Sequence, residues 1–330
     1  MVNATFGNRK FFESSRFLKM PSLRWLIPAG VAMALIGWAE SARAVTPVGF
    51  ATIVDCEAFL LRGTGVFKLV EGVRLYPEDI IDSSGADSCF VQLEFDDGAS
   101  LGIGPSTRLM LTPRIAVARA KPVPRAYILQ GILKLRSISA STIASPWVDV
   151  DAVAASAVLM VQPKTASVFA ESGELTGRTW QVGATAPVQL KSGEMTTWSV
   201  NAKPVNQNRP SEDFLRALPR PFLDTLPARA SMFRDAEREV RAKRIGEVSY
   251  AQIQPWIDSE PALRRANMAR WKVLARNPDI RRALLASLPT HPEWEVVLRP
   301  PPVPSTGAVS RDVRARASAP ILQIEKGVTP

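Results

Sequence analysis

The feature that most constrains the fold is a run of alternating residues that ends in a turn signal. From Cys89 to Phe95 every second residue is apolar, and the polar residues between them share the opposite face. This period-two alternation predicts a half-buried β-strand. The pair Asp97-Gly98 follows at once, and the alternation resumes at Leu101. An Asp-Gly pair between two alternating runs predicts a tight β-hairpin turn, in which the glycine adopts a positive φ.

Further strands are expected on both sides of this hairpin. Short apolar or alternating runs are separated by glycine and proline throughout the first two thirds of the chain. The expected strands cover residues 50–61, 127–135, 157–163, 167–171 and 188–194. We therefore predict a β-rich domain over residues 45–204.

The N-terminus carries the pattern of an export signal. Basic residues precede an apolar run from Trp25 to Ala39, whose 15 residues fall short of the roughly 20 that a membrane-spanning helix needs. Ala42-Arg43-Ala44 then offers a small-x-small cleavage site, which predicts a signal peptide over residues 1–44 and a mature start at Val45. The alternative is an uncleaved anchor, in which case the leader alone contacts the inner membrane. Both readings predict a periplasmic or otherwise exported protein.

Two cysteines, Cys56 and Cys89, are present in the chain. Both are expected on inward-facing strand positions, and an even pair in an oxidising compartment favours a disulfide. Such a bond would stabilise the fold by roughly 3–4 kcal/mol in the chain-entropy model. The alternative is a pair of buried free thiols.

Beyond Pro204 the apolar residues recur with helical spacing. The expected helices cover residues 211–218, 228–243, 249–257, 261–275 and 277–288. We predict an α-helical extension over residues 205–298 and a disordered, proline-rich tail over residues 299–330. The fold class is therefore α+β. Trp256, Trp271 and Trp294 in the helical part are expected to pack in a core, with an aromatic-lined partner groove as the alternative.

The charge balance does not favour a nucleic-acid partner. The net charge is +10, and the basic excess lies in the leader and in the last third of the chain. In the last third it is dispersed among acidic residues on amphipathic segments, which is typical of a solvated surface. Export makes nucleic acid a still poorer candidate.

Three elements of the β-rich domain resemble a known family. Residues 75–81 carry a leucine followed by Asp-Ile, and residues 91–109 read as a strand, a Phe-x-Asp-Gly turn, a strand and Pro-x-Ser/Thr. With Gly131 as the next element, their order and spacing resemble the periplasmic domain of FecR-type proteins over about residues 50–175. The resemblance implies an all-β FecR-like periplasmic domain.

This chain departs from the family at residues 153–156, where relatives often carry Arg-Gly-Thr, so any function of that element is not carried over to this chain. The residues before Trp25 are too few for a folded anti-sigma domain, so the resemblance implies the periplasmic module without the sigma-factor machinery.

Residues for catalysis are scarce. His291 is the single histidine and lies in a proline-bounded turn, where a satisfied or exposed loop histidine is expected. Asp149 and Asp151 share one face of an extended segment beside Trp147. That pairing is compatible with sugar cleavage or calcium binding, but it also arises often by chance. We therefore predict no catalytic, cofactor-binding or metal-binding residue and no cofactor; the predicted site residues are the disulfide pair and the hairpin turn.

These observations favour a non-enzymatic periplasmic binding module of the cell envelope. Its expected partner is another envelope protein or a peptidoglycan-type glycan. The alternative is a structural or assembly subunit of an envelope complex, and an envelope hydrolase is the least favoured reading.

Overall fold

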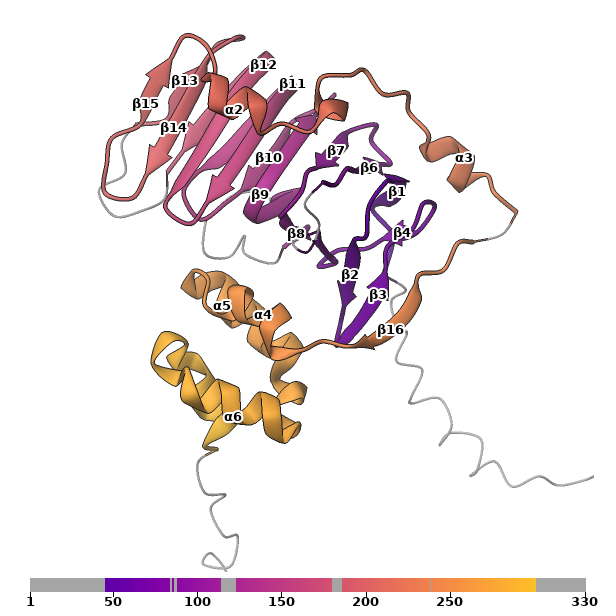
Figure 1. Cartoon of the computed structure of the whole chain (residues 1–330), viewed down its shortest axis with the longest axis vertical. Coiled ribbons are helices and arrows are strands. Elements are labelled where there is room, and N and C mark those ends of the chain that lie inside the picture. Colours follow the sequence, from indigo (N-terminus) through magenta and orange to yellow (C-terminus); the bar gives the residue numbers. More distant parts are fainter. Residues whose placement is uncertain are drawn as a thin grey trace, which may run out of the picture. The chain divides into compact units, whose positions relative to one another are not determined.

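The computed structural model describes residues 45–83, 85, 88–113, 123–179, 186–237 and 239–300. These residues form a large mixed β-sheet with a few helices in the C-terminal third (Figure 1). The predicted signal peptide lies outside the described residues, as does the predicted tail beyond residue 300.

Sixteen strands make up the sheet in the described part of the chain. Their bounds are β1 Gly49–Val54, β2 Phe59–Arg62, β3 Gly65–Lys68, β4 Arg74–Leu75, β5 Ile80–Asp82, β6 Val91–Phe95, β7 Ser100–Ile103, β8 Arg108–Leu111, β9 Ala126–Arg136, β10 Ser141–Ala144, β11 Asp149–Gln162, β12 Thr165–Arg178, β13 Val188–Leu190, β14 Met195–Ser199, β15 Val205–Gln207 and β16 Lys243–Glu247.

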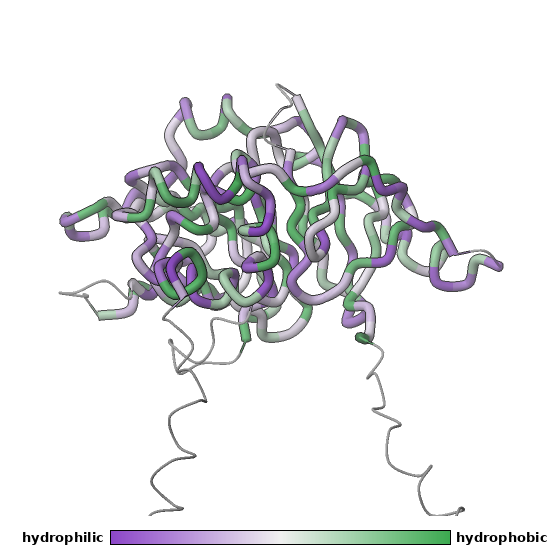
Figure 2. Tube along the Cα trace, turned by 90° about the horizontal axis from the view of Figure 1, so that it is seen from below, coloured by the Kyte–Doolittle hydropathy of each residue, from purple (hydrophilic) through white to green (hydrophobic). Residues whose placement is uncertain are grey.

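The order of the main sheet is β15-β14-β12-β11-β10-β9-β8-β5-β2-β3-β16, with β1, β4, β6, β7 and β13 joined at its side. Within the described sheet, β9 and β10 run parallel, whereas the other strand pairs are antiparallel. Hydrophobic and hydrophilic residues follow one another closely along the Cα trace (Figure 2). Many of the apolar positions gather in the main core cluster, which includes Leu93, Leu101, Leu135 and Leu159.

The turn between β6 and β7 contains Asp97 and Gly98. The two strands pair from Val91↔Ile103 to Glu94↔Ser100, and residues 96–99 connect the strand ends. Gly98 has φ +81°, and its N–H donates to the carbonyl of Phe95 at 3.0 Å. The Asp97 carboxylate accepts from the Ala99 N–H at 3.1 Å, which is the local hydrogen bond that aspartate supplies in turns.

The hairpin of β11 and β12 is longer than the sequence indicates. Strands were expected over 157–163 and 167–171, but each strand has 14 residues. The register shifts around residues 153–156, where Ala154 has φ +44° and Gly173 on the partner strand has φ +82°. The irregularity at residues 153–156 divides the apolar pattern, and periodicity alone therefore detected only the part of the hairpin beyond it.

The predicted helical extension contains two strands, β15 and β16, and this corrects the expectation for residues 205–298. The predicted helix over 228–243 is wrong: α3, Ala230–Arg234, has five residues, and β16 follows it. The region has few apolar residues, and Phe233 stacks against Phe50 of β1 with ring centroids 6.5 Å apart. The hydrogen bonds of β16 to β3 are long-range and satisfy the backbone without a helix.

Residues 208–230 run along one side of the sheet before α3 (Figure 1). They contain α2, Glu212–Arg216, and the 3₁₀ helix η1, Arg220–Phe222. Ser211 caps α2 as expected, since its side chain accepts from the Phe214 N–H. Phe214, Leu218 and Phe222 bury against Phe90 and other apolar residues of the sheet. We call residues 218–230 the covering segment.

The remaining helices lie between β16 and residue 298. They are α4 Tyr250–Ile257, α5 Pro261–Trp271, η2 Lys272–Arg276, α6 Pro278–Ala286, η3 Leu288–Thr290, η4 Pro292–Trp294 and α7 Glu295–Leu298. Trp256, Trp271 and Trp294 are fully buried, as expected for core packing. Their cluster also includes Ile80 and Tyr127 of the sheet, so the helices and the sheet share one core. No helix among the described residues is long and apolar enough to cross a membrane.

Arg270 at the end of α5 fixes the helices to the sheet. Its guanidinium donates to the carbonyls of Leu61, Gly63 and Glu78 at 3.0, 3.3 and 2.6 Å. The Trp271 indole N–H also donates to the carbonyl of Gly63, at 3.1 Å. Burial lowers the pKa of Arg270 from its ordinary value, although the charges of Glu78 and Asp79 oppose this.

Candidate functional site: an open groove on the sheet

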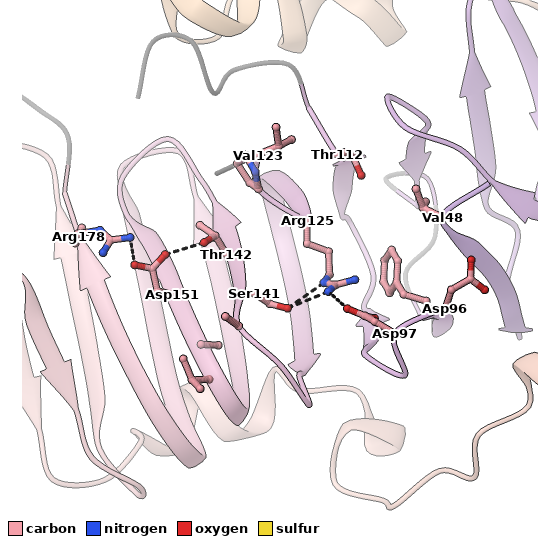
Figure 3. A pocket seen from close by; sticks show the side chains of 15 residues that line it. Val48, Asp96, Asp97, Thr112, Val123, Arg125, Ser141, Thr142, Asp151 and Arg178 are labelled. Carbon is pink, nitrogen blue, oxygen red and sulfur yellow. Dashed lines mark hydrogen bonds and ion pairs between the residues drawn. The ribbon is translucent and has the colours of Figure 1, made fainter. Parts of the chain in front are cut away.

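An open groove of about 800 Å³ lies beside the β6–β7 turn (Figure 3). Strands β10 and β11, the end of β12, the residues just before β9 and the turn supply its walls. Its lining residues are Val48, Phe95, Asp96, Asp97, Thr112, Val123, Pro124, Arg125, Ala140, Ser141, Thr142, Asp151, Ala152, Val153 and Arg178. The groove is therefore lined by both charged pairs and apolar side chains.

Arg125 organises one wall of the groove. Its guanidinium donates to the Ser141 hydroxyl at 3.1 Å and forms an ion pair with Asp97. It also covers the Phe95 ring, with its central carbon 4.6 Å from the ring centroid. Burial raises the pKa of Asp97, but the hydrogen bonds from Arg125 and Ala99 outweigh it, so the pKa lies below its ordinary value. This wall consequently carries a fixed pair of opposite charges.

Asp151 and Arg178 form the opposite wall. Thr142 of β10 pairs with Asp151 of β11, and its hydroxyl donates to the Asp151 carboxylate at 2.7 Å. Arg178 at the end of β12 forms an ion pair with the same carboxylate (Figure 3). Both partners keep about a quarter of their side-chain surface exposed, 26% for Asp151 and 27% for Arg178.

Apolar residues lie between these charged walls. Val123 and Val153 are 51% and 48% exposed, which is high for large apolar side chains. Phe95 is buried, at 4% exposure, beneath Arg125. Asp96 at the rim pairs with Arg234 of α3 at 2.9 Å. The groove thus combines exposed aliphatic surface with paired charges, which is typical of a surface that binds a polypeptide.

The predicted cysteine pair lies outside this groove. Cys56 and Cys89 are joined in the structure, with their Cα atoms 5.0 Å apart. Asp55 lies beside them, and these three residues are the cluster with metal-ligand spacing in the described part of the chain. Because both sulfur atoms are engaged with each other, the cluster does not offer a metal site.

The other residues weighed for catalysis are dispersed. Asp149 lies in β11 with Asp151, whose carboxylate is already paired with Arg178. Trp147 donates its indole N–H to the carbonyl of Gln162 at 2.9 Å. His291 is fully buried: its Nδ1 lies 3.2 Å from Asp258, and its Nε2 lies 3.1 Å from the carbonyl of Leu284. His291 is thus a satisfied core residue, one of the two expected states.

Of the predicted site residues, the groove includes Asp97 alone. The sequence reading missed Arg125, Ser141 and Arg178. Arg125 stands directly before a strand and Arg178 at the end of one, and charged residues are common at strand ends. Only the pairing of β9, β10, β11 and β12 brings these side chains to one groove.

Comparisons with known proteins give limited similarity. No family model matches the chain. No curated protein matches it either. Among solved structures, it is similar to two crystal structures, each of a candidate anti-sigma factor from Parabacteroides distasonis. The TM-score is 0.31 in both cases, with 11% and 12% sequence identity and 38% of this chain covered. The chain spans 58% and 57% of those two chains. The FecR-type resemblance of residues 50–175 stays a prediction.

Proposed function

We propose that this protein is an exported, non-enzymatic binding module of the cell envelope that contacts another envelope protein through the groove. The groove carries the proposal, because it presents exposed aliphatic surface between two pairs of opposite charges. A polypeptide offers the matching groups: backbone donors and acceptors, apolar side chains and single charges.

A polypeptide suits the groove better than a glycan does. Proteins commonly bind sugars by stacking the apolar face of the ring on an exposed aromatic side chain. Phe95 is the aromatic residue among the groove's lining residues, and Arg125 covers its ring at 4.6 Å. Among the described lining residues, no open aromatic face offers the main apolar contact that a glycan would use.

The proposed FecR-type character and the groove share one element. The Phe-x-Asp-Gly turn supplies Phe95 and Asp97 to the groove. In this proposal the hairpin that carries the resemblance is also part of the binding surface. The joined cysteines support an oxidising compartment and hence export, because disulfides persist there.

Site-specific photocrosslinking in cells tests the proposal. A photoreactive amino acid replaces Val153 or Val123 in the groove, and in the control it replaces Val296 of α7, which is 62% exposed. We expect both groove positions to yield one and the same protein adduct, and Val296 to yield none. Equal adducts at all three positions, or a glycan adduct in place of a protein, would contradict the proposal.

Export is tested separately. N-terminal sequencing of periplasmic protein should begin at Val45. Recovery of the chain in the cytoplasm would contradict the envelope location in the proposal, whatever the crosslinking result.

A further inference from the structure

A row of polar side chains crosses the sheet on the face opposite the main core. The register places Glu94 of β6 beside Ser100 of β7, and Ser100 beside Arg136 of β9. Arg136 in turn pairs with Ser156 of β11, and Ser156 with Ser172 of β12. Residues directly opposite each other on neighbouring strands point to the same face. The five side chains therefore form one continuous polar row.

The covering segment forms a roof over the Glu94 end of this row, whereas Arg136 and Ser172 stay exposed. A pocket of about 390 Å³ lies between them, lined by all five residues of the row on the sheet side and by Leu226 and Ala228 on the roof side. None of its lining residues belongs to the groove described above. The pocket is thus a second, separate site.

Glu94 fastens the roof at one end of the pocket. Its carboxylate accepts from the backbone N–H groups of Arg229 and Ala230 at 2.9 to 3.0 Å. It also accepts from Thr52 at 2.8 Å and Gln92 at 2.7 Å. Because a carboxylate has about four acceptor sites, these donors leave little capacity for a ligand. Glu94 closes the pocket rather than binding in it.

Arg136 is the residue of the row whose side chain can bind a ligand. Its guanidinium forms no ion pair or hydrogen bond with the part of the chain that the structure describes. The neighbouring Lys134 is engaged with Glu171 at 2.9 Å, and Asp224 of the covering segment lines a smaller cavity of about 20 Å³ with Arg136. Ser100 stands on one side of Arg136 in the row and Ser156 on the other, and the Ser156 hydroxyl donates to the Glu171 carboxylate. A planar guanidinium with five N–H donors, with the Ser100 hydroxyl beside it, matches an oxyanion.

We propose that this pocket binds a small ligand through an oxyanion, a carboxylate or a phosphoryl group, held by Arg136 with the Ser100 hydroxyl. Arg136 and Ser172 are exposed, so a ligand can reach this part of the pocket from solvent. The inference is independent of the groove and of the proposed protein partner.

Titration calorimetry on the full chain tests the pocket with three probes. They are inorganic phosphate, N-acetyl-alanyl-alanine with a free carboxylate, and the same dipeptide as its uncharged amide. We expect phosphate, the free dipeptide or both to bind and the amide not to bind. Binding by phosphate alone would identify a phosphoryl ligand, and binding by the dipeptide alone a carboxylate ligand. Binding by neither, or equal binding by the amide, would overturn the proposal.

Matched variants locate the site. Arg136→Gln should weaken binding by roughly tenfold to a hundredfold, the loss expected for hydrogen bonds to a charged group. Arg265→Gln removes an exposed arginine of α5 and should leave binding unchanged. Equal affinities of Arg136→Gln and the parent protein, or equal losses in both variants, would overturn the site. Should Arg136→Gln melt below the parent, Ser100→Ala decides instead: weaker binding supports the site, and unchanged affinity overturns it.

Discussion

The hydroxyl group of Thr107 occupies the space that a side chain at Gly131 would need. A Cβ atom built on Gly131 would lie 2.2 Å from the Thr107 Oγ1 and 2.4 Å from its Cα. The same hydroxyl accepts from the Ile132 N–H at 2.9 Å and lies 3.2 Å from the Ile132 carbonyl. Thr107 and Gly131 belong to two separate elements of the FecR-type resemblance. In the structure their contact connects the segment before β8 with the middle of β9.

This contact predicts a large loss of stability for Gly131→Ala. Gly131 has φ +103°, and the new methyl group would meet the backbone of Thr107 as well as its side chain. We expect a cost of about 2–4 kcal/mol, because backbone strain and overpacking add. The control is Gly193→Ala, where φ is +90° but nothing lies within 4 Å of the added atom. Chemical denaturation of both variants measures the difference, and equal losses would mean that Thr107 does not press on Gly131.

Gly98→Val tests the hairpin turn. Gly98 has φ +81°, a conformation that β-branched residues rarely adopt. The nearest atom to an added Cβ is the Ile138 Cδ1 at 2.8 Å, and this exposed side chain can move away. The cost should therefore come mainly from backbone strain and reach at least about 1 kcal/mol.

The matched control for that variant is Gly246→Val. Gly246 lies in the edge strand β16, has open space around it and does not require a positive φ. We expect a change of less than about 0.5 kcal/mol there. Thermal melts of both variants beside the parent protein give the comparison, and a Gly98→Val variant that melts with the parent would place the turn elsewhere.

The disulfide prediction is tested by alkylation. When the purified protein is unfolded without reductant and treated with iodoacetamide, intact mass should show no adduct on Cys56 or Cys89. After reduction, two adducts should form. Two adducts without reduction would show that the cysteines are free thiols in the mature protein, despite their 5.0 Å Cα separation.

Local patterns predicted the β6–β7 hairpin, because the alternation and the turn residues lie within fifteen residues of sequence. The same patterns placed Gln92 and Glu94 opposite the core, and the register agrees. They did not predict that the covering segment buries Gln92 and Glu94 on the face opposite the core. This contact is long-range in the sequence, because Glu94 and Ala230 are 136 positions apart. The error over 228–243 has the same origin. Helical spacing is a local signal, whereas the pairing of β16 with β3 depends on residues far away in the chain.

The anchoring of the covering segment by Glu94 should depend on pH. Burial raises the pKa of Glu94, but hydrogen bonds from Ala230, Thr52, Gln92 and Arg229 outweigh it and lower the pKa below the ordinary 4.5. A carboxylate with a lowered pKa in the folded state stabilises the fold above its unfolded pKa, and this contribution is lost as the pH falls through the folded value. Stability from Glu94 should thus be complete at neutral pH and decline below about pH 4.5.

Glu94→Gln isolates this effect, because the amide keeps the shape of the side chain but loses the charge. At pH 7 the variant should lose roughly 1–3 kcal/mol, the range for hydrogen bonds to a charged group. Hydrogen exchange should accelerate at the Arg229 and Ala230 amides, which donate directly to the carboxylate. The deficit relative to the parent should shrink as the pH falls below 4.5. Glu174→Gln, at an exposed position of β12, should match the parent at every pH. A deficit in Glu94→Gln that stays constant down to pH 2, or unchanged exchange at both amides, would show that Glu94 does not hold the covering segment through its charge.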